Sequence, residues 1–158
     1  MLRSRFVRLL AATVIATAIG GVAASAEARP RRPKVVWTKV TVREGRDQDE
    51  KQKLLEKILK KEARHANWGT AEAGPVEAQI EIRELAAVID GDVVRVSCSG
   101  VGKIPGVGQA KSKFSFGGRP SDRAKLEKHV MELVARGIVT RLAEMARAQH
   151  GAWTVEKA

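Results

Sequence analysis

The feature that most constrains the fold is a pair of alternating runs joined by Asp90-Gly91. Apolar side chains occupy every second position in residues 76–83 and again in residues 94–99. This period of two is typical of strands that bury one face and expose the other. An Asp-Gly pair between two such runs favours a tight turn. We therefore expect the centre of the chain to form an antiparallel β-hairpin.

The first of these runs changes phase after residue 83. Leu85, Val88 and Ile89 cannot all lie on one face of a regular strand. An extra residue inserted into one strand shifts the alternation in this way. We therefore expect a β-bulge near Glu84.

Two more strands are predicted, one before and one after the hairpin. Residues 35–43 alternate, with Val36 on the face of the later valines and Trp37 on the opposite face with the basic side chains. Residues 109–116 also alternate, with Phe114 and Phe116 opposite the lysines. Each strand would thus have one apolar face for a core and one polar face for solvent.

Residues 47–69 and 119–151 have the pattern of amphipathic helices. Apolar residues recur at spacings of three and four, and Asp47 is placed to cap the first helix. Gly151 is expected to end the second helix, whose apolar stripe also contains Gly137. A glycine within a helix costs about 1 kcal/mol relative to alanine. We therefore expect Gly137 to allow a close contact with the sheet.

The predicted elements follow the order β-α-β-β-β-α. Two amphipathic helices on one face of a mainly antiparallel four-stranded sheet would form a two-layer α+β sandwich. We expect a single α+β domain over residues 35–153, without an internal repeat. Over roughly residues 35–148 this order resembles the small α/β modules of bacterial envelope-assembly proteins. The resemblance is architectural and implies no functional residue.

The N-terminal residues 1–28 have the three parts of a secretory signal peptide. Arg3, Arg5 and Arg8 form a basic start, an uncharged apolar run follows over residues 9–24, and small residues then suit cleavage. The alternative is an uncleaved membrane anchor, but a span needs about 20 apolar residues. We expect the chain to be exported to the periplasm or secreted, and to be soluble after cleavage.

The chain is strongly basic. It has 29 Lys and Arg against 18 Asp and Glu, and removal of residues 1–28, with three Arg and one Glu, leaves a net charge of +9. The excess lies in residues 29–43, which start with a basic flexible tail at 29–34, and in residues 100–119. Such a field attracts anionic lipids, acidic glycans, nucleic acid or an acidic protein. Solubility alone is the other explanation for this charge.

The polar face of the predicted sheet and a glycine-rich segment collect many of these cations. Residues 100–108 contain four glycines and one proline, and we interpret them as a flexible loop between the last two strands. We expect this loop and the sheet face to bind an anionic surface or a protein partner. The candidate binding residues are Lys39, Arg43, Arg95, Lys103, Lys111 and Lys113.

The glycine-rich segment does not match a phosphate-binding motif. A Walker A loop ending at Gly102-Lys103 needs a glycine five residues before Gly102 and a hydroxyl residue directly after the lysine. Ser97 and Ile104 occupy those two positions. A dinucleotide fingerprint would place its third glycine where Pro105 stands. No nucleotide cofactor is therefore expected.

Patterns typical of catalysis and metal binding are also missing from the sequence. His65, His129 and His150 are isolated from one another, and no cysteine cluster accompanies them. The single cysteine, Cys98, cannot form an internal disulfide and is expected to pack as a small apolar side chain. No nucleophile elbow is present. We expect no catalytic residue, no metal and no cofactor.

These features favour an exported, non-catalytic envelope domain. Two alternatives stay open. An exported hydrolase with an unrecognised site would have a deep pocket lined by convergent polar groups. A basic nucleic-acid-binding module would show an affinity that falls steeply with salt, but RNA-binding sheets stack bases on aromatic rings, and only Trp37 could serve here.

Overall fold

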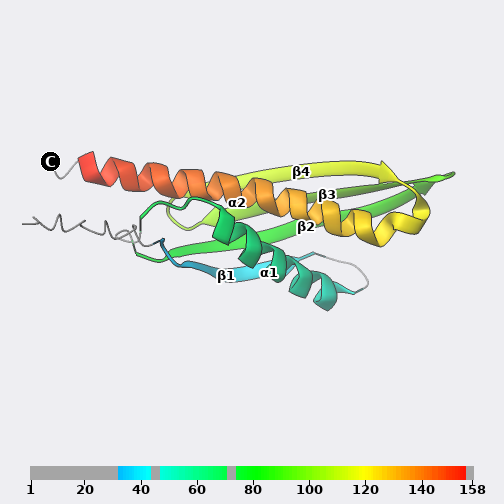
Figure 1. Cartoon of the computed structure of the whole chain (residues 1–158), viewed down its shortest axis with the longest axis horizontal. Coiled ribbons are helices and arrows are strands. Elements are labelled where there is room, and N and C mark those ends of the chain that lie inside the picture. The colour runs from blue at the N-terminus through cyan, green and yellow to red at the C-terminus, as the bar shows by residue number, and fades with distance from the viewer. Residues whose placement is uncertain (1–31, 44–46, 71–73, 156–158) are drawn as a thin grey trace, which may run out of the picture.

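The computed structural model describes residues 32–43, 47–70 and 74–155, the last six of them by backbone alone. The predicted signal peptide and residues 29–31 of the predicted tail lie outside the described residues. Within these ranges the elements follow the predicted order (Figure 1). They are β1 (Val35–Val42), α1 (Gln48–His65), β2 (Val76–Asp90), β3 (Val93–Ile104), β4 (Gly108–Gly118), the short 3₁₀ helix η2 (Pro120–Asp122) and α2 (Arg123–Val155).

The four strands form one mixed sheet in the order β1-β2-β3-β4. β1 and β2 pair in parallel, which is possible because α1 carries the chain back between them. The β2-β3 and β3-β4 pairs are antiparallel, and the turn between β2 and β3 contains Gly91 at a φ of +58°. The α+β class and the mainly antiparallel four-stranded sheet are confirmed.

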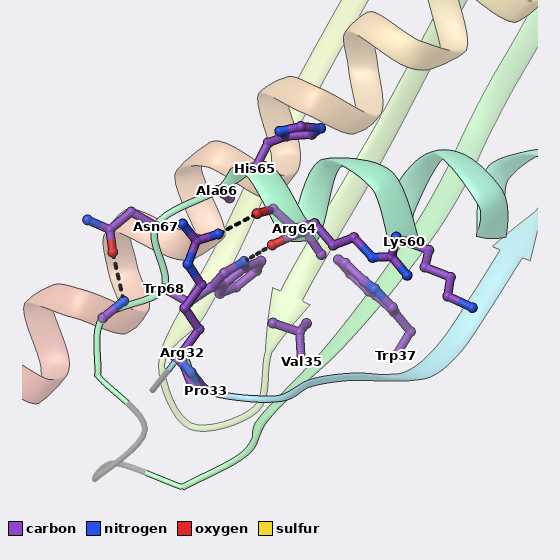
Figure 2. A pocket seen from close by; sticks show the side chains of 12 residues that line it. Arg32, Pro33, Val35, Trp37, Lys60, Arg64, His65, Ala66, Asn67 and Trp68 are labelled. Atoms are coloured by element: carbon purple, nitrogen blue, oxygen red, sulfur yellow. Dashed lines mark hydrogen bonds between the residues drawn. The ribbon is translucent and has the colours of Figure 1, made fainter. Parts of the chain in front are cut away.

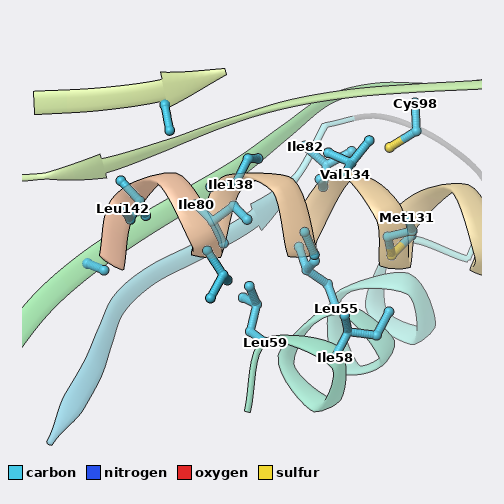
Figure 3. Packing of buried hydrophobic residues seen from close by; sticks show 14 of the residues in the cluster. Leu55, Ile58, Leu59, Ile80, Ile82, Cys98, Met131, Val134, Ile138 and Leu142 are labelled. Carbon is cyan, nitrogen blue, oxygen red and sulfur yellow. The ribbon is translucent and has the colours of Figure 1, made fainter. Parts of the chain in front are cut away.

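Both helices pack against the sheet through apolar side chains. α2 runs along β3 and β4, and α1 contacts β1 and α2 (Figure 1). Along β3 the buried side chains alternate with less buried ones, as a strand with one covered face requires. Each large apolar side chain buried in this way contributes about 1.5–3 kcal/mol to folding. The core joins α1, the sheet and α2 (Figure 3) through Leu55, Leu59, Ile80, Ile82, Val134, Ile138 and Leu142.

The predicted bulge in β2 is confirmed. The pairing of β2 with β3 shifts register between Ile82 and Glu84, so Arg83 is the extra residue. The shift keeps Leu85 on the face of the buried Ile82, because Leu85 pairs with the buried Cys98. The bulge therefore explains why the apolar residues change phase at this point in the sequence.

A second bulge, in β1, changes which side chains in the first part of this strand face the core. The pairing of β1 with β2 shifts register between Trp37 and Lys39. Trp37 pairs with Ala78, whose side chain is fully buried, and Trp37 packs on the hydrophobic core. Val36 instead faces outward and is 36% exposed. The prediction that Val36 faces the core and Trp37 faces solvent is therefore wrong.

The glycine-rich segment is mostly strand. Gly102 lies in β3 beneath α2, where a Cβ atom would overlap the side chain of Ile138 and lie 2.9 Å from a methyl carbon of Leu142. Only residues 105–107 form the turn to β4, with Gly106 at a φ of +76°. The prediction of a flexible loop over residues 100–108 is therefore wrong. The glycines in β3 let the helix approach the sheet.

The glycine within α2 has the matching role. A Cβ atom on Gly137 would lie 3.0 Å from the Oγ atom of Ser112 in β4. The expected close contact between Gly137 and the sheet is confirmed. Phe114 and Phe116 lie farther along β4 on the same side as Ser112, and they are 40% and 41% exposed because β4 is the last strand of the sheet.

The helix ends differ from the sequence prediction. Asp47 adopts a left-handed conformation with a φ of +69°, and its side chain makes no capping hydrogen bond. α1 ends at His65, before Gly69. α2 continues through Gly151 to Val155, because a glycine near a helix end can still take helical angles.

The described part of the predicted tail packs against the domain. Pro33 is buried, and the carbonyl oxygen of Lys34 accepts a hydrogen bond of 2.9 Å from the backbone N–H of Val76. The Nη1 atom of Arg32 donates a hydrogen bond of 2.8 Å to the carbonyl oxygen of Arg64 at the end of α1. Residues 32–34 thus extend the contacts of β1 beyond its first residue.

Candidate binding surfaces

The outer face of the sheet, which is turned away from α1 and α2, carries all six predicted binding residues. Every one of these side chains is exposed. They come from three strands and from the residue that follows β1, because the outward positions of neighbouring strands lie side by side in a sheet. The six residues are Lys39, Arg43, Arg95, Lys103, Lys111 and Lys113.

One row across this face contains only amides and ammonium groups. The strand registers place Lys39 beside Gln79, Gln79 beside Lys103, and Lys103 beside Gln109. Neighbouring strands lie about 4.8 Å apart, so the two lysine backbones are about 10 Å apart. A shallow hollow of about 320 Å³ is lined by these four side chains together with Thr41, Ile80, Glu81, Arg83 and Val101. We call Lys39, Gln79, Lys103 and Gln109 the cationic row.

Two acids neutralise part of the same face. Glu81 forms ion pairs with Arg43 at 3.1 Å and with Arg83 at 3.5 Å. Glu84 lies 3.9 Å from Lys113. These pairs are exposed, so each contributes little stability, but each removes a cation from the set available to a ligand.

Of the four predicted binding residues that no acid of the described ranges neutralises, three lie close together and one lies apart. Within the described residues, Lys39, Lys103, Lys111 and Arg95 have no acidic partner within 4.0 Å. Lys111 pairs with Val101, one row from the cationic row. Arg95 lies eight residues from Lys103 along β3, which is about 27 Å. The fold therefore brings Lys39, Lys103 and Lys111 together and leaves Arg95 apart near the hairpin tip.

No aromatic ring of the described residues lies on the outer sheet face. Trp37, the one candidate from the sequence, turns inward and packs against Trp68, with ring centres 6.5 Å apart. Sheets that bind single-stranded RNA use aromatic rings as stacking platforms. The inward position of Trp37 removes the feature that the nucleic-acid alternative needed.

The sequence prediction missed a cavity at the other side of the sheet. It lies between the start of β1, the last turns of α1 and the segment that follows α1 (Figure 2). The alternation of residues places Trp37 on the wrong face, since the bulge in β1 is not visible in that pattern. The sequence pattern places Trp68 only at the end of the predicted helix over residues 47–69. The contact between the rings of Trp37 and Trp68 depends on the tertiary packing of two separate segments.

Cys98 and His129 belong to residue types that can act as nucleophiles or metal ligands, but both pack against other side chains of the domain. Cys98 is fully buried, and burial, with a smaller effect from Glu84, raises the pKa of its thiol to about 12. The ring of His129 packs edge-on against Phe116, with centres 5.6 Å apart. Within the described ranges, no group of three or more His, Cys, Asp or Glu side chains could hold a metal ion.

An ion pair that the sequence did not indicate joins the two helices. The Nε atom of Arg136 in α2 donates to Glu62 of α1 at 3.1 Å, and its Nη2 atom donates to the other carboxylate oxygen at 3.5 Å. These bonds, and the negative charge of Glu62, raise the pKa of Arg136 above its ordinary value. Glu62 lies on the apolar side of α1, where sequence periodicity alone suggests core.

Comparisons with known proteins leave the function open. No protein-family model matches this chain, and no curated protein matches it. A candidate lipoprotein from Caulobacter crescentus CB15 is similar in structure, with a TM-score of 0.40 and 13% identity over 72% of this chain and 91% of its own. A minor lipoprotein from Acinetobacter baumannii has a TM-score of 0.33 and 10% identity over 73% of this chain and 95% of its own. Likenesses at this level carry no conclusion about function. In the part of the chain that the structure describes, no helix is both long and apolar enough to cross a membrane.

Proposed function

We propose that this chain is an exported, non-catalytic domain that binds an anionic surface or an anionic protein partner in the cell envelope through the outer face of its sheet. The observation that carries the proposal is the cationic row beside Lys111. Three lysines without acidic partners among the described residues lie there on a face that neither helix covers. A flat array of ammonium groups suits a surface of distributed negative charge better than a single small molecule.

The lining of the cavity of about 740 Å³ between β1 and α1 is mainly apolar and basic. No carboxylate, hydroxyl or thiol side chain is among the twelve residues that line this cavity. The buried thiol of Cys98 lies in the core and is held in its protonated form.

Binding to vesicles with and without an anionic phospholipid tests the electrostatic part. We expect the protein to sediment with anionic vesicles at low salt and to be released as salt rises, because the Debye length shortens. Each lysine near an anionic membrane contributes about 1 kcal/mol. The triple variant Lys39→Glu, Lys103→Glu, Lys111→Glu should therefore bind at least about a hundredfold more weakly. Lipopolysaccharide and an acidic glycan serve as further anionic probes.

A second triple variant separates local charge from net charge. Lys53, Lys57 and Lys61 are exposed on α1, away from the sheet face. Changing these three to Glu alters the net charge of the protein by the same amount as the first variant. Equal losses in the two variants would reduce the proposal to general basicity. A wild-type affinity that salt does not change, or no affinity for any of these anions, would contradict the anionic-surface form. In that case, capture of envelope proteins by the wild type and not by the first variant would support the protein partner.

A further inference from the structure

The cavity between β1 and α1 has the size of a small-molecule site. Its volume is about 740 Å³, within the range of about 300–1,000 Å³ that is usual for ligand pockets. The walls come from residues 32–37 and 60–69, which are separated in sequence and joined by the packing of α1 on β1. The cavity is thus a product of tertiary packing.

The floor of the cavity is apolar and contains two tryptophans that pack against each other. Trp68 is only 4% exposed, and its indole N–H donates a hydrogen bond of 3.0 Å to the carbonyl oxygen of Ala63 at the end of α1. Trp37 packs against it edge-on, at an interplanar angle of 80°. With its N–H satisfied inside the protein and its ring almost fully buried, Trp68 supports Trp37, whose partly exposed ring is the apolar surface open to a ligand. Val35 and Pro33 complete this part of the wall.

The rim of the cavity is cationic. The lining includes three cations, Arg32, Lys60 and Arg64, together with His65, and it contains no acidic residue. Figure 2 shows that Lys60 and Arg64 extend from α1 on the side where Trp37 rises from β1, whereas the His65 ring points away from Trp37. Neither Lys60 nor Arg64 has an ion-pair partner within 4.0 Å among the described residues.

Attraction to the C-terminal end of the α1 dipole explains only part of this arrangement. That dipole favours cations in the last turn, where Arg64 and His65 stand. Lys60 lies more than one turn earlier, and Arg32 arrives from a different segment of the chain. Arg32 uses one nitrogen to bond the carbonyl oxygen of Arg64 and keeps other N–H groups for a further acceptor.

We propose that this cavity binds an amphiphilic anion, meaning a molecule with an apolar body and a single phosphate, sulfate or carboxylate head. The body would lie on Trp37, with Trp68 behind it, and the head would meet Lys60 and Arg64 at the rim. This site is separate from the outer sheet face, since the cavity lies among α1, β1 and the segment after α1. The inference therefore stands independently of the proposed function.

Tryptophan fluorescence gives a direct measurement of binding at this site. The chain has three tryptophans, and a Trp153→Phe background leaves only the two that line the cavity. In this background we would titrate octyl phosphate, octanol and octyltrimethylammonium, each below its micelle concentration, and repeat the titrations by calorimetry. Octyl phosphate should bind at least about tenfold more tightly than the neutral and cationic probes, because a hydrogen bond to a charged group is the stronger kind.

Paired variants test the roles of the rim residues. The double variant Lys60→Ala, Arg64→Ala should weaken octyl phosphate binding about tenfold or more and leave octanol binding unchanged. The control, Lys57→Ala with Lys61→Ala, removes two exposed lysines of the same helix that do not line the cavity, and should bind like the parent. All four positions are exposed, so circular dichroism should show the same folded spectrum in each variant.

Three results with these probes and double variants would overturn the inference, and a fourth comes from a variant of the sheet face. These are equal affinities for the three octyl probes, equal losses in the two double variants, or no fluorescence and no calorimetric response to octyl phosphate. The variant Lys103→Glu, Lys111→Glu distinguishes the two proposals. It should lose vesicle binding and keep octyl phosphate binding, whereas a loss of both would place the octyl phosphate on the sheet face and contradict a site at the cavity.

Discussion

At the scale of single residues, Gly102 shows how this fold depends on an absent side chain. Its position in β3 lies so close to α2 that a Cβ atom would overlap Ile138 and crowd Leu142. Gly102→Ala should therefore push the helix from the sheet and lower the free energy of unfolding by about 1–3 kcal/mol, the usual cost of overpacking a core. Urea unfolding followed by circular dichroism measures the change.

Gly117 provides the matched control for this substitution. It also lies in a strand, but a Cβ atom there would have its nearest neighbour at 3.6 Å, which is an ordinary contact. Gly117→Ala should change the free energy of unfolding by less than about 0.5 kcal/mol. If the two variants were equally stable, the close approach of α2 to Gly102 would not limit the packing.

Cys98 makes stability depend on pH in the alkaline range. Burial, followed by the charge of Glu84, raises the pKa of its thiol from the ordinary 9.0 to about 12. Between these values the unfolded chain releases a proton that the folded chain keeps. The thiol's contribution to stability is therefore complete below about pH 9 and falls as pH rises, by about 1.4 kcal/mol per pH unit.

A comparison with Cys98→Ala isolates this effect. The variant lacks the titrating group, and the small cavity that it leaves has a cost that does not depend on pH. The difference in free energy of unfolding between wild type and variant should be constant up to about pH 9 and should then shrink or reverse by pH 10 and above. A difference that stayed constant through pH 10.5 would show that the thiol ionises freely in the folded protein.

At the scale of elements, the pair of Glu62 and Arg136 fixes α1 against α2. The Glu62 side chain is 9% exposed, whereas that of Arg136 is 58% exposed. Arg136→Ala would leave a nearly buried carboxylate without its partner, a loss that partial solvent access to the arginine reduces. We expect the free energy of unfolding to fall by about 1–2 kcal/mol.

A double-mutant cycle distinguishes the ion pair from helix propensity. Adding Glu62→Gln to Arg136→Ala removes the unpaired charge and should recover part of the loss, with a coupling energy of about 0.5–1.5 kcal/mol. Arg141 is exposed on the same helix and makes no ion pair within the described residues, so Arg141→Ala should be close to neutral. If Arg136→Ala changed the free energy of unfolding as little as Arg141→Ala, the ion pair would make no measurable contribution to stability.

The elements themselves could be predicted from the sequence, but their contacts could not. Alternation and helical stripes gave the six main elements, the Asp90-Gly91 turn and the bulge near Glu84, since each is a local pattern. The bulge after Trp37 left no such trace, because the residues on both sides of it are compatible with either phase. The role of Gly102 is ambiguous in the sequence for a similar reason, since a glycine suits both a loop and a close helix contact.

For the candidate sites too, some features could be predicted from the sequence, and others depend on tertiary contacts. The outward lysines of the sheet could be placed on one face from their alternation with apolar residues. The acids that pair with Arg43 and Lys113, and the distance of Arg95 from the others, follow only from strand register. The cavity with its two tryptophans depends on a bulge and on a segment that folds back after α1, and neither has a signature in the sequence.

At the scale of the whole molecule, the export hypothesis makes a prediction about mass. Residues 1–28, which lie outside the described residues, have the basic start, apolar run and small residues of a cleaved leader. Expression of the full chain in a Gram-negative host should yield a protein in the periplasmic or culture fraction whose N-terminus is near Glu27 or Arg29, measured by intact mass and N-terminal sequencing.

A substitution in the apolar run serves as the control for this prediction. Val14→Arg places a charge in the middle of the run that a signal peptide must keep apolar, and it leaves the folded domain unchanged. This variant should stay in the cytoplasm at the mass of the uncleaved chain. A full-length mass for the wild type in the membrane fraction would instead indicate the uncleaved anchor, and the sheet face and cavity would then act at a membrane surface to which the chain is tethered.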